Sequence, residues 1–364
     1  MEFDRTAIQQ ARQYLAENAA LRNAVGACAD DALEPEPIGV GEHNLNYAFD
    51  VPSTRNRFVL RINVARQPFH ADQVGYEFAA LEVLERSGRT PRPVFLDNSL
   101  DAPGEGALVE SFCAGEVLDF DNLRPGDLRC AAQIMADVHA VIVPSEGSGL
   151  FQPEDPLRTL YEECVERFAI YRASAFEDER ITRWVERFIK VADPADLPSR
   201  TQGESVHVVN TETLPSHFII PASSANEAAQ NEIGQGRFCD APGYFVDWER
   251  PIIGEVAQDI AYFVAPTTTL WDSGFMFDSD QADSFIEDYW RAVDGRFERG
   301  SFDARFRAFR MMTALRSATW FCRALLNYGE GGVGHTTVKT ARKFPVYLSD
   351  EFMNMLAKDC FGLG

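Results

Sequence analysis

Lysine is nearly absent from this chain of 364 residues, in which it occurs only at Lys190, Lys339, Lys343 and Lys358. Acidic residues outnumber basic ones by 56 to 34, giving a formal net charge of -22. Such a charge repels phosphate backbones and anionic lipids, which argues against nucleic acid and membrane surfaces as partners. An acidic, lysine-poor surface also favours adaptation to concentrated salt, where self-repulsion is screened. The alternative explanation is codon bias combined with chance acidity.

Paired cysteines and long apolar runs are also missing. The 7 cysteines are scattered and contain no C-x-x-C pair, which argues against a disulfide scaffold or a zinc ribbon. The N-terminus is polar, with no apolar run behind it, and no apolar stretch is long enough to span a bilayer. We therefore expect no signal peptide and a location in a reducing cytoplasm. The sequence does not reveal the oligomeric state.

Apolar periodicity divides the chain into a mixed part and a helical part. Hydrophobic residues make up 45% and charged residues 25%, as in ordinary globular proteins, and the length allows two lobes. Helical spacing predicts helices over residues 4–22 and 73–85. Short alternating runs predict strands over residues 47–51, 57–62, 93–96 and 107–112.

Beyond residue 115 the pattern is mostly helical. Helices are predicted over residues 127–143, 156–175, 183–191, 280–293 and 305–328, and short apolar runs fall at 206–209, 218–220 and 244–246. The polar segment 221–243 has the composition of an exposed insertion. The predicted fold class is α+β, with a small antiparallel-sheet lobe containing one helix (residues 1–112) and a larger, mainly helical lobe (residues 113–364).

A glycine-containing turn lies between two of the predicted strands. It contains Gly39 and Gly41 and is followed by Asn44. Glycine lets a backbone come close to phosphate because no Cβ intervenes. The turn is not a P-loop, since no Gly-Lys-Ser/Thr follows, and not a dinucleotide fingerprint, since a strand comes next. Taken alone, it fits an ordinary hairpin better than a nucleotide site.

A cation interrupts the apolar strand that follows. Arg61 lies in Phe58-Val-Leu-Arg-Ile62, and a charge in such a strand needs a partner. Glu77, in the next predicted helix, is placed to supply one. Such a pair can hold the α- and β-phosphates of a nucleotide. An arginine on an exposed edge strand explains Arg61 alone equally well.

Further polar and acidic residues follow short apolar runs in the second part. One loop contains Asn210, Glu212 and His217, and another contains Asp247. Two such loops side by side could hold Mg²⁺ and orient a hydroxyl group. Asp259 begins an apolar helix, where a negative charge is also favoured by the helix dipole. The order of all these features along the chain is typical of kinase-type phosphoryl transfer.

On these residues, the chain resembles the aminoglycoside phosphotransferase family, small-molecule kinases related to choline kinase and homoserine kinase. The likeness runs from about residue 38 to residue 263, and Val246-Asp-Trp-Glu249 with Asp259-Ile-Ala261 is its most specific part. The resemblance implies a two-lobed, protein-kinase-like fold with ATP in the cleft. It also implies transfer of the γ-phosphate to a hydroxyl of a small molecule.

Residue roles follow from the resemblance position by position. Glu77 would pair with Arg61, Asp247 would bind Mg²⁺, and Asp259 would brace the catalytic loop. Glu212 would be the catalytic base, beside Asn210. The residues expected to bind nucleotide are Gly39, Gly41, Asn44, Arg61, Glu77, and Glu110 and Phe112 of the hinge.

The sequence departs from the family at the catalytic loop. The family's loop reads His-x-Asp, four residues, then Asn, whereas this chain has Asn210, Glu212 and His217 at those positions. Glutamate places its carboxylate one methylene further out, and displacements of about 1 Å can cost roughly 100-fold in rate. His217 would be a softer metal ligand than asparagine, so Mn²⁺ is an alternative to Mg²⁺.

Two functions are consistent with the sequence. The first is an ATP-dependent small-molecule kinase with Glu212 as base and Asp247 as metal ligand. The second is a catalytically degenerate, kinase-like protein that binds nucleotide or metabolite without transferring phosphate. The acceptor is not identified. The acidic residues Asp283, Glu287 and Asp288 would suit a cationic hydroxyl compound, although in so acidic a chain they discriminate poorly.

Overall fold

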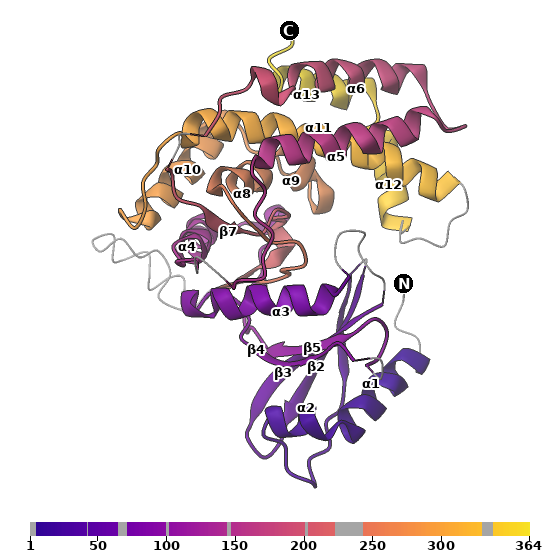
Figure 1. Cartoon of the computed structure of the whole chain (residues 1–364), viewed down its shortest axis with the longest axis vertical. Coiled ribbons are helices and arrows are strands. Elements are labelled where there is room, and N and C mark those ends of the chain that lie inside the picture. The colour runs from indigo at the N-terminus through magenta and orange to yellow at the C-terminus, as the bar shows by residue number, and fades with distance from the viewer. Residues whose placement is uncertain are drawn as a thin grey trace.

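The chain folds into a sheet-containing part and a larger helical part (Figure 1). The computed structural model describes residues 5–41, 43–64, 71–99, 102–143, 147–200, 203–222, 243–329 and 338–364. In Figure 1 the sheet lies at the bottom with α1 and α2, and the helices α5, α6 and α8 to α13 lie at the top. This arrangement agrees with the predicted α+β class.

The first part contains three helices and five strands of one antiparallel sheet. The strand order is β1-β2-β3-β5-β4. The elements are α1 (Arg5–Glu17), α2 (Ala19–Ala24), β1 (Glu36–Val40), β2 (Asn44–Val51), β3 (Asn56–Asn63), α3 (Gln73–Leu84), the short η1 (Glu85–Ser87), β4 (Pro93–Asp97) and β5 (Ala107–Ser111).

The alternation of side chains in β3 separates a core face from a polar face. Phe58, Leu60 and Ile62 belong to an apolar cluster that also contains Leu15 of α1 and Leu21 of α2. Since successive side chains of a strand point to opposite faces, Arg61 lies on the other face. That face therefore presents polar groups towards the helical part of the molecule.

The N-terminal helix is two helices rather than one. The sequence predicted a single helix over residues 4–22, but α1 ends at Glu17 and α2 begins at Ala19. Asn18 lies between them in an extended conformation (φ -77°, ψ 97°), and its side chain accepts a hydrogen bond from Leu21 N at 2.9 Å. Asparagine is a favoured N-cap residue, so it ends one helix by starting the next.

Helix α3 connects the two parts. It runs between the sheet and the helices in Figure 1. Ala80, Leu81 and Leu84 are fully buried, and they belong to the core of the helical part rather than to the sheet cluster. Glu77 is buried on the same helix. Packing of α3 into the larger core therefore fixes this carboxylate relative to the residues of the second part.

The second part contains most of the helices and two small sheets. Strands β6, β8 and β9 form one sheet, and β7 pairs with β10. The elements are β6 (Glu116–Val117), η2 (Phe120–Asn122), α4 (Asp127–His139), α5 (Pro156–Arg172), α6 (Glu179–Val191), η3 (Pro194–Asp196), β7 (His207–Val209), η4 (Pro215–His217), β8 (Phe218–Ile220), β9 (Tyr244–Phe245), β10 (Ile252–Gly254), α8 (Val256–Phe263), α9 (Pro266–Asp272), α10 (Ser279–Val293), α11 (Phe302–Gly329), α12 (Val338–Tyr347) and α13 (Asp350–Asp359).

Most of the predicted insertion, residues 223–242, lies outside the described residues. The division of the chain at residues 112 and 113 stays a prediction. Within the part of the chain that the structure describes, no helix is long and apolar enough to cross a membrane.

Gly104 and Gly88 allow the cost of a steric clash to be separated from the cost of a left-handed backbone conformation. Gly104 and Gly88 have nearly the same left-handed conformation, with φ of +65° and +66°. A methyl group on Gly104 would collide with the carbonyl oxygen of Asn63, whereas one on Gly88 would meet open space. We expect Gly88→Ala to cost about 1 kcal/mol of folding free energy, the cost of the backbone conformation alone. Gly104→Ala should cost at least about 1 kcal/mol more because of the added clash. Equal losses in chemical denaturation would contradict this account.

Candidate active site

The side chain of Asp259 organises the loop that follows β7. Its Oδ2 accepts the backbone N–H of Asn210 at 2.8 Å, and its Oδ1 accepts that of Thr211, also at 2.8 Å. Its own carbonyl oxygen accepts the hydroxyl of Thr213 at 2.8 Å. Asp259 is fully buried, so these charge-assisted hydrogen bonds are shielded from water. One carboxylate therefore fixes the backbone on both sides of the Asn210–Thr211 peptide bond.

A buried relay continues from Asp259 into the helical core. Asp259 Oδ2 lies 3.2 Å from His139 Nε2, and His139 Nδ1 lies 2.8 Å from the hydroxyl of Tyr289. A histidine that donates from Nε2 to the carboxylate accepts at Nδ1 from the tyrosine. Burial, followed by the charge of Asp259, raises the pKa of Tyr289 well above its usual value, so this hydroxyl keeps its proton. The relay connects α4, α8 and α10 to the loop.

The backbone at two of the loop positions is strained. Thr211 and Asp247 have φ of 70° and 66°, the left-handed region that non-glycine residues rarely adopt. Asn210 Nδ2 donates to the carbonyl oxygen of Asp247 at 2.8 Å, so the residue before Thr211 is bonded to the second strained residue. Strain of this kind persists only where surrounding contacts determine the conformation, and it clusters at functional sites.

Arg61 joins the sheet to the loop after β9. Its Nη2 lies 2.9 Å from Glu77 Oε1, 2.8 Å from Asp247 Oδ1 and 3.5 Å from Glu249 Oε1. Asn44 of β2 also donates to Glu249. The ion pair between Arg61 and Glu77 that the sequence suggested is thus present, and one nitrogen carries most of the network.

The surroundings of Arg61 contain more carboxylates than cations. Burial raises the pKa of Glu110 to about 8, against the opposing attraction of Arg61. Burial raises the pKa of Glu77 to about 7, again against that attraction. The pKa of Glu249 is raised well above its usual value, first by burial and then by the charge of Asp247. A single guanidinium does not neutralise all of these carboxylates.

Glu212 lies in the loop that follows β7, and two arginines lie close to its carboxylate. Arg316 Nη2 is in direct contact with Glu212 Oε1, and Arg316 Nη1 donates to the carbonyl oxygen of Thr211 at 2.8 Å. Arg250 Nη1 lies 3.8 Å from Glu212 Oε1. Burial raises the pKa of Glu212, but the charges of Arg316 and Arg250 outweigh it and hold this pKa below its usual value. Glu212 is therefore an ionised carboxylate.

Asp247 and His217 form a second pair beside it. His217 Nε2 lies 3.2 Å from Asp247 Oδ2. Burial raises the pKa of Asp247, but His217 and Arg61 outweigh it, so this carboxylate is ionised as well. Two donors bound side by side to one octahedral cation at about 2.1 Å each lie roughly 3 Å apart. The spacing of this pair therefore fits one divalent cation.

Within the described residues, Asp247 and His217 are the two side chains that we place at such a cation. No group of three or more His, Cys, Asp or Glu side chains in the described ranges is placed to hold a metal ion. Magnesium commonly takes one or two carboxylates and fills its remaining positions with water and substrate phosphates. The arrangement suits a cation that arrives with a phosphorylated ligand better than a permanently bound one.

The remaining predicted nucleotide residues lie on or next to strands β1, β2 and β5 of the sheet. Gly41 N donates to the carbonyl oxygen of Asn44 at 2.9 Å, which closes the turn after β1. A methyl group on Gly39 or Gly41 would meet only ordinary contact distances. The chain's own atoms therefore do not require glycine there. Phe112 lies beyond β5, where Arg57 Cζ stands 5.0 Å from its ring centre.

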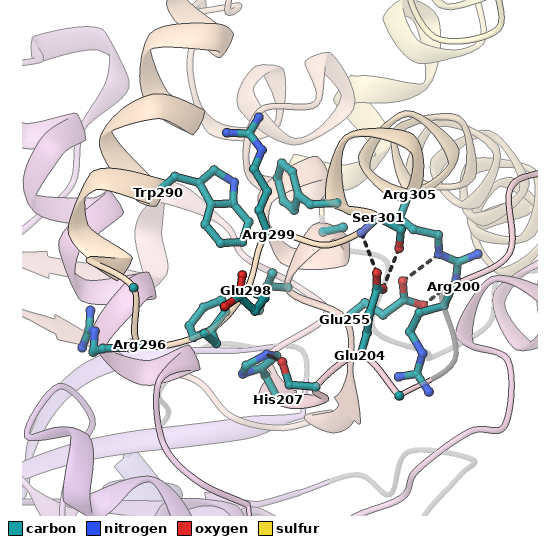
Figure 2. Close-up of a pocket in the computed structure, with 17 residues that line it drawn as sticks. Arg200, Glu204, His207, Glu255, Trp290, Arg296, Glu298, Arg299, Ser301 and Arg305 are labelled. Atoms are coloured by element: carbon teal, nitrogen blue, oxygen red, sulfur yellow. Dashed lines mark hydrogen bonds and ion pairs between the residues drawn. The ribbon is translucent and has the colours of Figure 1, made fainter.

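A separate cavity of about 590 Å³ is lined by other residues (Figure 2). His207, at the start of β7, and Trp290 of α10 are among those that line it. Its walls are joined by the buried pair of Arg305 with Glu255, and by hydrogen bonds from Ser301 to Glu204 at 2.7 and 2.6 Å. None of the site residues predicted from the sequence lines this cavity.

Part of the chain matches the model of a known family. A model described as the phosphotransferase enzyme family matches residues 34–207. This confirms the resemblance inferred from the sequence. The match to the phosphotransferase family ends at His207, before Asn210, so the divergent loop lies outside it. No curated protein matches the chain at the threshold applied.

Solved structures extend the likeness to nearly the whole chain. An ethanolamine kinase from Plasmodium vivax has a TM-score of 0.60 at 14% identity, covering 98% of this chain and 89% of its own. A microcompartment-associated aminopropanol kinase has a TM-score of 0.60 at 16% identity, covering 96% of each chain. A spectinomycin phosphotransferase in complex with ADP and spectinomycin has a TM-score of 0.55 at 11% identity, covering 97% and 98%. At these identities the comparison shows a two-lobed, kinase-like fold.

Three arginines and one glutamate at the site were not anticipated. Arg167, Arg250, Arg316 and Glu249 belong to this region, but the sequence suggested a role for none of them. The one available signal was an arginine within the apolar run Met311-Met-Thr-Ala-Leu-Arg-Ser-Ala-Thr319 of α11, which needs a partner for the same reason as Arg61.

The hydrogen bonds of Asp259 predict a large cost for a near-isosteric change. Asp259→Asn places an amide N–H₂ against one of the two backbone N–H groups and removes the buried charge. We expect a loss of about 2–4 kcal/mol of folding free energy. Tyr289→Phe, which removes only the hydroxyl at the end of the relay, should cost about 1 kcal/mol. Denaturant unfolding of both variants tests the order, and a smaller loss for Asp259→Asn would contradict it.

The raised pKa of Glu110 predicts a pH dependence of stability. Its folded-state pKa of about 8 lies above the usual 4.5, so the folded protein binds this proton more tightly than the unfolded chain. The stabilising effect is complete below pH ~5 and is lost as the pH rises through ~8. Glu110→Gln should therefore lose less stability over that interval, by at least about 1.4 kcal/mol, the equivalent of one pKa unit. Glu82→Gln, at an exposed position of α3, is the control and should follow the wild type.

Proposed function

We propose that the chain is an ATP-dependent phosphotransferase that moves the γ-phosphate to a hydroxyl group of a small molecule. Its family and its fold support a phosphotransferase acting on small molecules. One observation supports the more specific proposal of transfer from ATP to a hydroxyl group. The loop held by Asp259 contains Glu212 and is joined to Asp247 through Asn210, and Arg61 reaches the same Asp247 from the sheet together with Glu77.

The nucleotide would bind on the sheet side of this arrangement. Arg61 contacts both Glu77 and Asp247, and a guanidinium binds phosphate oxygens with two parallel hydrogen bonds. Asn44, the first residue of β2, closes the glycine turn by accepting from Gly41 N, and its side chain donates to Glu249. We assign Gly39, Gly41 and Asn44 to the phosphates, and Glu110 and Phe112 to the base.

The metal would bind at Asp247. Its ionised carboxylate is the kind of ligand that Mg²⁺ prefers, and His217 Nε2 is within reach of the same cation, for which Mn²⁺ is the alternative. When bound, a divalent cation supplies neutralisation of the charge on the phosphate oxygens. Arg61 contacts Oδ1 of Asp247 and so fixes the direction in which Oδ2, the oxygen beside His217, points.

Glu212 would receive the proton. In the proposed step the acceptor hydroxyl oxygen forms a bond to the γ-phosphorus, the bond from that phosphorus to the β,γ-bridging oxygen breaks, and ADP leaves. The hydroxyl proton passes to the Glu212 carboxylate, which is ionised and therefore able to accept it. Asn210 Oδ1 accepts the backbone N–H of Glu212 at 3.1 Å, which positions the base.

One observation favours the alternative, a kinase-like binding protein without transfer. Both carboxylates that the chemistry needs are already in contact with cations or with an imidazole: Glu212 with Arg316, and Asp247 with Arg61 and His217. A protein in which these contacts are permanent would bind nucleotide without activating a hydroxyl group.

Two variants separate the functions. Glu212→Gln keeps the shape of the loop but removes the proton acceptor, so we expect turnover to fall by at least about 100-fold while ATP still raises the unfolding midpoint. Asp247→Asn should abolish the part of that rise that requires Mg²⁺ or Mn²⁺. In the wild type the rise corresponds to roughly 2.7 kcal/mol at a hundred times the dissociation constant.

The exposed Glu186, which pairs with Arg172 at 2.6 Å, supplies the control variant Glu186→Gln. It should leave both the unfolding shift and turnover unchanged. Undiminished turnover in Glu212→Gln would refute its role as base. A metal-dependent shift with ATP, but no ADP release with any hydroxyl compound, would favour the binding protein.

A further inference from the structure

Three arginines from three different elements gather on the side of Glu212 that faces the helical part. Arg167 lies on α5, Arg250 follows β9, and Arg316 lies on α11. Helices α5 and α11 pack along each other in Figure 1. Such a concentration of positive charge is unexpected in a chain with a net charge of -22.

Arginines and glutamates alternate in a series of ion pairs that begins and ends with an arginine. Arg316 contacts Glu212, which lies 3.8 Å from Arg250, and Arg250 Nη2 lies 3.8 Å from Glu163 Oε2. Glu163 Oε2 lies 3.9 Å from Arg167 Nη2. In this series three guanidinium groups alternate with two carboxylates, and Arg250 is also attracted by Glu249, whose raised pKa favours its neutral form. An ionised group of opposite charge is the component that would balance it.

Arg167 is the cation whose bonding is least complete. Its only ion pair in the described part of the chain is longer than a hydrogen bond, and its Nη1 is buried there without any partner. Its side chain is only 16% exposed. Buried donors are almost always satisfied, so a guanidinium left in this state points to a group that the folded chain does not itself supply.

The pKa values agree with a shortage of negative charge. Burial lowers the pKa of Arg167, and the charges of Arg316 and Arg250 lower it further. Burial also lowers the pKa of Arg250, as does the charge of Arg316. This is the opposite of the situation around Arg61, where carboxylates are in excess.

We propose that the acceptor carries an anionic group, a carboxylate or a phosphate, which Arg167 and Arg250 bind while its hydroxyl group lies at Glu212. The inference rests on the proposed function, because it names the class of acceptor for the same site. It replaces the cationic acceptor suggested by Asp283, Glu287 and Asp288, of which Asp288 is paired with Arg291 on its own helix at 2.7 Å.

The position of Arg167 favours the acceptor over the nucleotide. Arg167 contacts Glu163, which lies 3.8 Å from Arg250, and Arg250 lies 3.8 Å from Glu212. Within the described residues no ion pair joins Arg167 directly to Asp247, which Arg61 contacts. We therefore assign the anionic group to the acceptor, whose hydroxyl the proposal places at Glu212. The fold itself does not fix the charge of the acceptor, since one fold hosts many substrates.

The test compares four compounds that share a three-carbon skeleton with hydroxyl groups: glycerate, glycerol 3-phosphate, glycerol and serinol. The first two are anionic, the third is neutral and the last is cationic. We expect the anionic compounds, and inorganic phosphate, to raise the unfolding midpoint of the wild type at constant ionic strength without nucleotide. Arg167→Gln should lose this rise, and Arg167→Lys should keep part of it because it keeps the charge. Arg172→Gln, an exposed arginine of the same helix, should behave as the wild type.

The kinetic arm measures ADP release with ATP and Mg²⁺. Arg167→Gln should raise KM for the anionic acceptor at least about tenfold and leave kcat and the ATP-induced unfolding shift nearly unchanged. Stabilisation or turnover by serinol but by no anionic compound overturns the proposal, as does an anion-induced shift that persists in Arg167→Gln. Loss of the ATP-induced shift in that variant would assign Arg167 to the nucleotide instead. Failure of the proposed function is distinguishable, because it abolishes ADP release but leaves the nucleotide-free anion arm informative.

Discussion

The guanidinium of Arg61 is the connection on which the geometry of the site depends. Its Nη2 contacts Glu77 of α3 and Asp247 of the loop after β9, and so joins the sheet to the helical part through one nitrogen. Breaking a buried pair of this kind leaves an uncompensated charge, which is far more costly than the pair is stabilising. The relative position of the two parts is therefore coupled to the charge state of this cluster.

Asp259 performs a comparable task within the helical part. Its carboxylate holds two consecutive backbone N–H groups, and the neighbouring Thr211 has a left-handed φ of 70°. A threonine held in that conformation costs free energy, which the buried hydrogen bonds offset. The conformation of the loop is thus fixed by buried core residues, since Asp259 is itself held by His139 and, through it, by Tyr289.

The sequence was sufficient where local periodicity carries the information. Alternation over residues 57–62 predicted β3, and the arginine within that strand predicted a buried partner, which proved to be Glu77. The division of the N-terminal helix at Asn18 was missed because its amphipathic spacing continues across the cap. The arginines around Glu212 could not be predicted, because Arg316 and Glu212 are 104 residues apart and no pattern connects them.

The two sides of the site differ in the sign of their unbalanced charge. Around Arg61, the pKa values of Glu77, Glu110 and Glu249 are raised, so that side favours a ligand that arrives with positive charge. Under the proposed function, the divalent cation that accompanies the nucleotide supplies positive charge at Asp247 on that side. Around Glu212, arginines exceed carboxylates, and an anionic acceptor meets the opposite need. Because buried charges of one sign are costly until they are matched, each side would select its own ligand and reject the other's. Glu212, the base under the proposed function, is kept ionised by Arg316 and Arg250.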